Sequence, residues 1–306
     1  MKILVTGASG FLGTELCSFL ESLEHTVSKI NSKNCDLTNE KNLHNYDENK
    51  YDLIFHLAAW TQAGDFCMKY PGDQWIINQQ INTNILMWWV KSQPQAKLVF
   101  MGTSCVYAPQ GTLREFEYML GEPIDSLYTY AMTKRMLYQG ARALNKQYGL
   151  KYLCAVPSTL YGPGYHTDGR QMHFIFDLIR KIIRGKEFGE KVILWGDGNQ
   201  KRELVAVSDF VKILWSLTEK FNNQIFNIGA GEEYSIKSFA ELICEIIGYP
   251  HDEISFDSSK YVGALSKCLN TEKIKIALPD YHLKPLAQGL KETIDWFYEK
   301  NVYKQN

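Results

Sequence analysis

Short apolar runs alternate with amphipathic stretches along the first half of the chain. The runs have the length and composition of strands in a sheet covered on both sides, at residues 2–5, 25–30, 52–57, 97–101 and 151–156. Between them, the pattern is helical, most clearly at residues 14–23, 74–91 and 128–148. Because strands that alternate with helices form βαβ units, the sequence predicts an α/β fold with a doubly wound parallel sheet.

The pattern changes after residue 156. Loops with glycine and proline, at 157–169 and 196–199, alternate there with short helices at residues 174–184, 208–219 and 235–247. We interpret residues 157–306 mainly as a smaller α/β substrate-binding lobe that closes over the carboxyl ends of the sheet, with some segments returning to the sheet. Residues 1–156 then form the domain that contains the sheet.

A glycine-rich loop joins the first predicted strand to the first predicted helix. Gly7, Gly10 and Gly13 have the spacing that lets a backbone turn tightly and approach a pyrophosphate. The helix that follows would add N–H groups and the positive end of its dipole. The sequence therefore predicts a Rossmann-type dinucleotide-binding domain, in which the cofactor also contacts the other residues of this loop, Ser9, Phe11 and Leu12.

The segment after the second predicted strand bears on the choice of dinucleotide. NAD-binding proteins usually carry a carboxylate there, which holds the ribose 2′-hydroxyl. Residues 31–34 have no carboxylate and include Lys33, which suits the 2′-phosphate of NADP. Asp36 is the rival carboxylate, but it lies further past the strand, where a role near the adenine suits it better. We therefore expect NADP(H), with NAD(H) as the alternative.

Three side chains suggest acid/base chemistry at the edge of the sheet. Tyr130 and Lys134 are four residues apart in a predicted helix, so they share one face. A neighbouring ammonium favours the phenolate, which otherwise forms only near pH 10. Thr103 directly follows a predicted strand, at the carboxyl edge where α/β sheets bind ligands. We expect Tyr130 to exchange a proton with the substrate. We also expect both Tyr130 and Lys134 to contact the cofactor, where Lys134 holds the nicotinamide ribose.

This set resembles the extended short-chain dehydrogenase/reductase family, in which Ser/Thr-x-x-x-Tyr, here Thr103 to Tyr107, precedes a distal Tyr-x-x-x-Lys. The resemblance covers nearly the whole chain and includes residues 56–59, 157–163 and 202–203. It implies an enzyme that acts on a nucleotide sugar. It also implies further cofactor contacts at Leu37, Leu57, Ala58, Ala59, Asn78 and Pro157.

The residues after Thr103 distinguish the members of this family. The 4,6-dehydratases have Asp-Glu there, whereas this chain has Ser104 and Cys105. Cys105, and His173 ten residues beyond Pro163, resemble the GDP-L-fucose synthases, which epimerise a GDP-linked 4-keto sugar at C3 and C5 and reduce it at C4. Inversion needs one group to take a proton and another to return it on the opposite face, and a thiol and an imidazole titrate near the useful range. The resemblance thus adds Cys105 and His173 to the catalytic residues.

The same resemblance implies substrate contacts at Ser104, Cys105, Thr159, His173, Lys181, Trp195 and Arg202. Thr159 replaces an asparagine of that group, so the sugar stays open between a 6-deoxyhexose and a heptose for surface-polysaccharide synthesis. The alternatives are a 4-reductase without epimerase activity and a redox-neutral NAD-dependent 4-epimerase. A dinucleotide sensor without catalysis is a further alternative, which the intact set of Thr103, Tyr130 and Lys134 disfavours.

Composition adds little to this picture. The 306 residues carry a formal net charge of -1, which gives no reason to expect nucleic acid or a membrane as partner. Seven scattered cysteines without metal-ligand spacing indicate reduced thiols and no metal site, and no apolar stretch reaches the roughly 20 residues of a membrane span. We expect a cytoplasmic enzyme. We also expect a homodimer, in which the Trp-rich helix at residues 81–90 joins the Tyr130 helix in a four-helix bundle.

Overall fold

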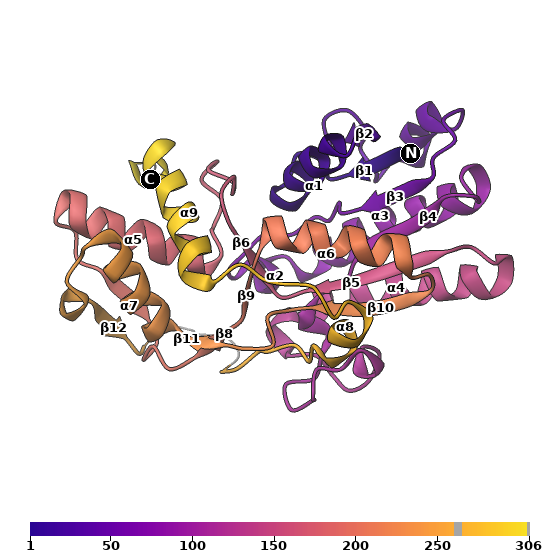
Figure 1. Ribbon diagram of the computed structural model, residues 1–306. Helices are drawn as coiled ribbons and strands as arrows, with labels where there is room; N and C mark the ends of the chain where they lie inside the picture. Colours follow the sequence, from indigo (N-terminus) through magenta and orange to yellow (C-terminus); the bar gives the residue numbers. More distant parts are fainter. Residues whose placement is uncertain (260–264, 305–306) are drawn as a thin grey trace.

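The computed structural model describes residues 1–259 and 265–304 (Figure 1). Its centre is a six-stranded parallel sheet built from β1 (Lys2–Thr6), β2 (Thr26–Ile30), β3 (Leu53–His56), β4 (Lys97–Met101), β5 (Tyr152–Pro157) and β10 (Gln224–Ile228). The strand order is β10-β5-β4-β3-β1-β2. The chain changes direction across the sheet at the boundary of β1 and β3, and sheets of this type bind ligands at the carboxyl ends of the strands on either side of such a point.

Two pairs of helices cover the sheet. On one face, α1 (Phe11–Ser22) packs against α6 (Val207–Lys220), and on the other, α3 (Pro71–Ser92) packs against α4 (Tyr128–Tyr148). Successive residues of each strand point alternately into these two cores, which is why the strands read as continuous apolar runs. The predicted Rossmann-type fold class is confirmed.

The rest of the chain forms a smaller lobe around α5 (Phe174–Phe188), α7 (Ile236–Ile247) and α9 (Leu286–Glu299), which lie together on the left of Figure 1. Short strand pairs accompany it: β6 (Thr159–Tyr161) with β9 (Leu204–Ala206), β7 (Ile193–Trp195) with β12 (Ser255–Asp257), and β8 (Lys201–Arg202) with β11 (Tyr234–Ser235). The remaining elements are α2 (Phe66–Lys69), α8 (Glu272–Ala277) and the 3₁₀ turns η1 (Glu40–Tyr46), η2 (Ser104–Val106), η3 (Glu115–Glu117), η4 (Asp125–Leu127), η5 (His251–Glu253) and η6 (Val302–Lys304). The division of the chain at residue 156 stays a prediction.

The helices and strands that the pattern predicted are present, with ends that differ by a few residues. Helix α4 has the expected bounds, whereas α1 begins at Phe11, directly after the glycine of its N-cap, so that its first turn belongs to the glycine loop. The pattern gave no clear signal for β10 or α9. Helix α9 contains Gly289, which weakens the helical pattern but is needed, because a Cβ there would collide with the Tyr161 ring.

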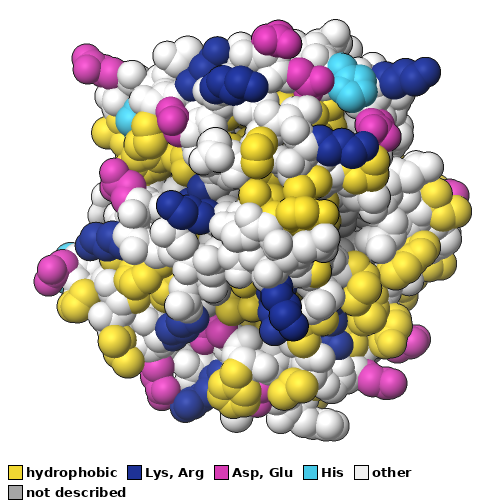
Figure 2. Space-filling model, turned by 90° about the vertical axis from the view of Figure 1, so that its right-hand side faces the viewer, with side chains coloured by type: hydrophobic (Ala, Val, Ile, Leu, Met, Phe, Trp, Pro, Cys, Tyr) yellow, Lys and Arg dark blue, Asp and Glu magenta, His cyan; other side chains and the backbone are white. Residues whose placement is uncertain are grey.

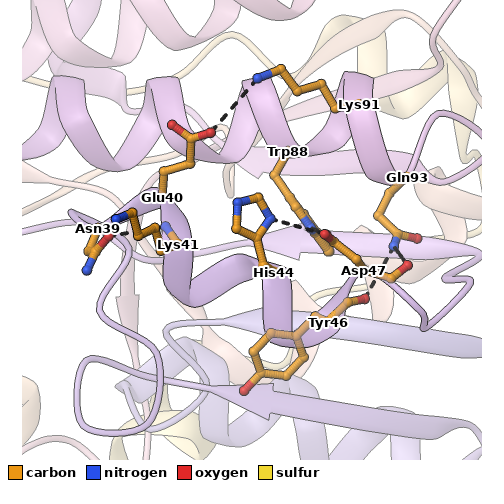
Figure 3. A network of polar contacts seen from close by, with 9 residues as sticks. All are labelled: Asn39, Glu40, Lys41, His44, Tyr46, Asp47, Trp88, Lys91 and Gln93. Carbon is orange, nitrogen blue, oxygen red and sulfur yellow. Dashed lines mark hydrogen bonds and ion pairs between the residues drawn. The ribbon is translucent and has the colours of Figure 1, made fainter.

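A polar network fixes η1 on helix α3 (Figure 3). Asp47 accepts a 2.6 Å hydrogen bond from the indole of Trp88. Gln93, just past the end of α3, donates to two main-chain carbonyls of the same segment at 3.4 and 3.2 Å. Asn84 of α3 donates to two more carbonyls just before η1, at 2.8 and 3.1 Å. These contacts hold the chain that follows β2 firmly on α3.

Lysine, arginine, aspartate and glutamate side chains are interspersed on the face of the molecule in Figure 2. Within the described residues, no helix is long and apolar enough to cross a membrane. Trp88 and Trp89, which motivated the predicted dimer, are 3% and 0% exposed and therefore pack inside the subunit. The outward side of α3 instead carries Ile76, Thr83 and Met87, which are exposed or half-buried. The homodimer stays a prediction.

Candidate active site

The glycine loop forms a cradle at the carboxyl end of β1. Gly7 has a φ of +66°, in the left-handed region that favours glycine. A Cβ on Gly7 would lie 2.9 Å from the Ala58 nitrogen, and one on Gly13 would collide with the Gly7 carbonyl oxygen and lie 2.8 Å from the Ala8 Cα. The close approach brings Leu57 and Ala58 next to the loop. The backbone is therefore shaped to let a pyrophosphate lie on the first turn of α1, as a dinucleotide site requires.

Of the other residues in the glycine loop, some lie at the turn and others pack against a hydrophobic core. Ser9 is exposed at the turn, Leu12 packs half-buried against the core beneath α1, and the Phe11 ring points toward the smaller lobe. Phe11 contacts Tyr165 edge-on, with ring centroids 5.2 Å apart, and Tyr165 in turn lies 6.0 Å from the ring of His173. The side chain of Phe11 thus joins the glycine loop to the smaller lobe.

The turn after β2 offers a cation and no carboxylate. The Asn31 side chain accepts from the Lys33 N–H at 2.9 Å, and this closes the turn and leaves Lys33 exposed. Asp36 accepts hydrogen bonds from the main chain and hydroxyl of Thr38 at 3.0 and 2.8 Å, so its carboxylate serves its own turn. Leu37 is buried. This arrangement fits a 2′-phosphate better than a free 2′-hydroxyl.

Asn78 holds the loop that follows β3. Its amide accepts from the Trp60 N–H and donates to the Trp60 carbonyl, both at 2.9 Å, and it donates also to the Gln74 carbonyl. The side chain therefore shapes the path of the backbone directly after Ala58 and Ala59. Pro157, at the end of β5, is half-buried.

Thr103, Tyr130 and Lys134 come together where β4 ends and α4 begins. The Thr103 hydroxyl is hydrogen-bonded to the Tyr130 phenol. The Lys134 Nζ lies 6.0 Å from the centroid of the Tyr130 ring. Burial raises the pKa of Tyr130, and burial lowers the pKa of Lys134 to about 8. Lys134 is only 6% exposed and has no acceptor within the described residues, so it is ready for a ribose hydroxyl.

Cys105 lies two residues after Thr103, in the middle of η2, and is half-buried. Its Sγ is 3.0 Å from the Nζ of Lys267. Burial works to raise the pKa of the thiol, but the Lys267 ammonium and hydrogen bonds from Lys267 and Thr103 outweigh it, so the pKa is lowered. Cys105 also lies close enough to Tyr130 to affect the pKa of the phenol.

His173 is the N-cap of α5 and faces the same lysine. Crowding of the ring by protein atoms lowers its pKa, and the charges of His166 and Lys267 add to this effect. The residue as a whole is exposed, although protein atoms crowd its ring. The structure thus brings both predicted epimerase residues within the electrostatic reach of Lys267.

The remaining predicted substrate residues lie on the smaller lobe or beside Cys105. The Lys181 ammonium lies 5.8 Å from the centroid of the Trp195 ring, and Lys181 also pairs with Asp177 at 2.9 Å. Trp195 is 49% exposed. Arg202 donates to the Lys201 carbonyl at 2.7 Å. Ser104 and Thr159 are both half-buried.

Sequence reasoning missed two residues here. Lys267 belongs to no motif, and 162 positions separate it from Cys105 in the chain. Glu203 was noted only as part of the family resemblance, but its carboxylate accepts hydrogen bonds from the main chain of Leu269 and Gly231. The signal in the sequence is a single glutamate between Arg202 and an apolar strand, because a carboxylate that is buried there needs hydrogen-bond donors.

Comparisons with known proteins agree with this geometry. Residues 3–229 match the model of the NAD dependent epimerase/dehydratase family. A GDP-L-fucose synthase from Dictyostelium discoideum is 30% identical over 97% of this chain and 95% of its own length, and a GDP-L-colitose synthase from Yersinia pseudotuberculosis is 28% identical over 98% and 99%. The structure of a GDP-L-fucose synthetase from Naegleria fowleri bound to NADP superposes with a TM-score of 0.86 at 24% identity, over 100% of this chain and 96% of that one. The chain is therefore an enzyme that belongs to the NAD-dependent epimerase/dehydratase family.

Proposed function

We propose that this enzyme epimerises a GDP-linked 4-keto sugar at C3 and C5 and reduces it at C4 with NADPH. The observation that carries the proposal is the pairing of two sets of side chains at one edge of the sheet. Thr103, Tyr130 and Lys134 form a reductase set, and Cys105 and His173 stand beside it. The names of the two curated relatives, a GDP-L-fucose synthase and a GDP-L-colitose synthase, support a GDP-linked sugar.

The reduction at C4 would use the first set. NADPH, when bound, supplies the hydride for C4. Tyr130 donates the proton to the oxygen at C4, and Thr103, which is hydrogen-bonded to Tyr130, orients the same oxygen. The Lys134 ammonium stabilises the phenolate that Tyr130 becomes when it gives up its proton. Because the pKa of Lys134 is lowered to about 8, Lys134 can return a proton to that phenolate.

The epimerisation would use the second set. A ketone at C4 makes the protons at C3 and C5 acidic, and an enolate forms when one is removed. Cys105, whose pKa is lowered by Lys267, takes the proton from one face. His173, which is neutral near pH 7, takes up a proton from water and returns it on the other face, and its lowered pKa makes the protonated ring a ready donor. The hydroxyls of Thr103 and Tyr130 hydrogen-bond the enolate oxygen meanwhile.

We propose NADPH rather than NADH as the cofactor. The exposed Lys33 and the absence of a carboxylate among residues 31–34 support this choice. The NADP-bound structure from Naegleria fowleri, which shares the fold, also supports it.

The seven cysteines are all unpaired, which is in keeping with a cytoplasmic location.

For the nucleotide, we propose that the exposed face of Trp195 stacks on the base and that Lys181 and Arg202 pair with the diphosphate. The Lys181 ammonium 5.8 Å from the centroid of the Trp195 ring and the exposure of Trp195 support this arrangement. The sugar is a 6-deoxyhexose or a heptose, and the segment near Thr159 is where we expect the distinction to be made.

The test is incubation with NADPH and GDP-4-keto-6-deoxymannose in deuterated water, followed by NMR of the product. Deuterium at C3 and C5 together with oxidised NADPH is the expected result. Reduction without deuterium would mean a plain 4-reductase, and a product without net NADPH oxidation would mean a redox-neutral epimerase. The variant Cys105→Ser is expected to lose deuterium incorporation by about 10²-fold or more while it still binds NADPH.

We also propose a homodimer that forms through the outward side of α3 together with α4. Ile76, Thr83 and Met87 share this side of the helix, and Met87 is half-buried without belonging to the core. Light scattering at micromolar concentration should give twice the mass of the 35.2 kDa chain. Met87→Glu should give the single mass, with Lys212→Glu on the exposed side of α6 as the control. A wild-type monomer would contradict the proposal.

A further inference from the structure

Lys267 forms the closest charged contact at the candidate site, yet it belongs to no recognised motif. Its Nζ lies 3.0 Å from the Sγ of Cys105, and both side chains are half-buried. We propose that Lys267 is the positioning residue that holds Cys105 as a thiolate, ready to take a proton from the carbon next to the ketone. The chemical meaning of this inference rests on the function proposed above, but the ion pair itself can be tested without a substrate.

The chain holds the lysine in this position through two carboxylates. Glu233 accepts hydrogen bonds from the main-chain N–H of Lys267 at 3.0 Å and from the Ser266 hydroxyl at 2.7 Å. Glu203 accepts from the N–H of Leu269 at 3.0 Å. Both carboxylates bind the backbone on either side of Lys267 and leave its ammonium free to face Cys105. When the backbone of a lysine is already fixed, its side chain loses less conformational entropy on forming an ion pair.

Three titratable side chains near Cys105, on α2, on α4 and at the start of α5, are neutral at pH 7, and the Glu233 carboxylate binds the main chain of Lys267. Cys67 of α2 lies near Cys105, and burial raises the pKa of its thiol. Burial likewise raises the pKa of Tyr130 on α4. At the start of α5, crowding and nearby positive charges lower the pKa of His173. Because none of these three carries a charge near pH 7, the Lys267 ammonium dominates the electrostatic environment of the thiol.

The proton transfer balances with this assignment. The thiolate of Cys105 takes the proton from the carbon next to the ketone, an S–H bond forms and the C–H bond breaks. The electron pair of that bond moves into the enolate, whose charge lies on the oxygen at C4. The net charge of the site does not change in this step, because the negative charge moves from sulfur to oxygen. Lys267 takes no part in the transfer of the proton, so its charge can stabilise both the thiolate and the enolate.

Alkylation with iodoacetamide measures the thiolate directly, because the thiolate displaces iodide and forms a stable C–S bond. The rate of modification of Cys105 would be followed from pH 5 to 10 by mass spectrometry of its peptide. Cys268, the other half-buried cysteine, serves as the internal reference, because burial and Glu203 raise its pKa to about 12. We expect Cys105 to react faster than Cys268 at pH 7 by at least about tenfold.

Three variants decide the role of Lys267. Lys267→Gln should shift the midpoint of Cys105 alkylation upward by at least about one pH unit, which lowers the rate at pH 7 by about tenfold. Lys267→Arg keeps the charge and should restore the low midpoint. Lys237→Gln, on the exposed side of α7, should leave the wild-type profile unchanged. Unchanged NADPH binding in all three would confirm that the variants are folded.

An unshifted midpoint in folded Lys267→Gln would overturn the inference, as would a failure of Lys267→Arg to restore it. A shifted midpoint in an enzyme that shows no deuterium exchange with the sugar substrate would leave the ion pair standing and refute the proposed function instead. The two proposals can therefore fail separately. In an active enzyme, we expect Lys267→Gln to reduce deuterium exchange at C3 and C5 by about the same factor as alkylation.

Discussion

The buried carboxylate of Glu203 predicts a stability that depends on pH in an unusual direction. Glu203 is 2% exposed, and burial raises its pKa from 4.5 to about 7, although hydrogen bonds from the N–H groups of Leu269, Gly231 and Ala230 oppose the rise. Because the pKa is higher in the folded protein than in the unfolded chain, the folded state binds more protons between these two values. The contribution of Glu203 to stability is therefore complete below pH 4.5 and is lost as the pH rises through 7.

The size of the effect follows from the shift. A rise from 4.5 to about 7 corresponds to about 3 kcal/mol, of which about 2.5 kcal/mol is lost between pH 5 and pH 8. Glu203→Gln removes the titration and keeps the shape of the side chain. The wild type should therefore exceed the variant in free energy of unfolding by about 2.5 kcal/mol more at pH 5 than at pH 8.

Urea unfolding followed by tryptophan fluorescence, at both pH values for both proteins, would measure this difference. Other titrating groups are common to the two proteins and cancel. Glu219→Gln, at the exposed end of α6, is the matched control and should follow the wild type within about 0.5 kcal/mol at each pH. A wild-type advantage that is equal at the two pH values, or larger at pH 8, would refute the reasoning. It would mean that the hydrogen bonds to the ionised carboxylate outweigh the cost of burying its charge.

Three further predictions concern the cofactor and the reduction. Tyr130→Phe should lower turnover by about 10²–10⁴-fold without weakening NADPH binding, as judged by steady-state kinetics and fluorescence titration, and a loss of binding instead would contradict a proton-donor role. Gly13→Ala should abolish NADPH binding in the same titration, because its Cβ would collide with the carbonyl oxygen of Gly7, and wild-type affinity would show that the loop does not bind a dinucleotide. Lys33→Ala should raise the Kd for NADPH by about tenfold and leave the Kd for NADH unchanged, so an equal effect on both cofactors would exclude contact with the 2′-phosphate.

The sheet and the glycine loop were predictable because their signals are local. A buried strand, three spaced glycines and the first turn of a helix follow one another within thirteen residues, and each restricts the same stretch of backbone. Tyr130 and Lys134 were predictable for a similar reason, since the helical repeat alone puts them on one face. The short strand β10 was not, because its five residues form a strand only when β5 lies beside them.

The electrostatic part of the candidate site could not be predicted from the sequence. The charge next to Cys105 comes from a lysine in a segment without a helix or strand, which is held by Glu203 and Glu233 through main-chain hydrogen bonds. No sequence pattern reports such bonds, since any residue can donate its N–H. Asn78 differs from Lys267: the resemblance implied a cofactor contact, which stays a prediction, and in the structure its side-chain amide binds the backbone of Trp60 and Gln74.

The place of α6 and β10 in the sheet layer has a consequence for biosynthesis. A ribosome completes β5 long before it completes these two elements, which end at Lys220 and Ile228. Until then, the nascent chain exposes the hydrogen-bonding edge of β5 and the apolar face of α1 that α6 later covers. The cofactor-binding half can therefore complete its sheet only after Ile228 has been made, and until then the exposed edge and apolar surface favour aggregation. A fragment that stops near residue 157 should be insoluble, however complete its glycine loop is.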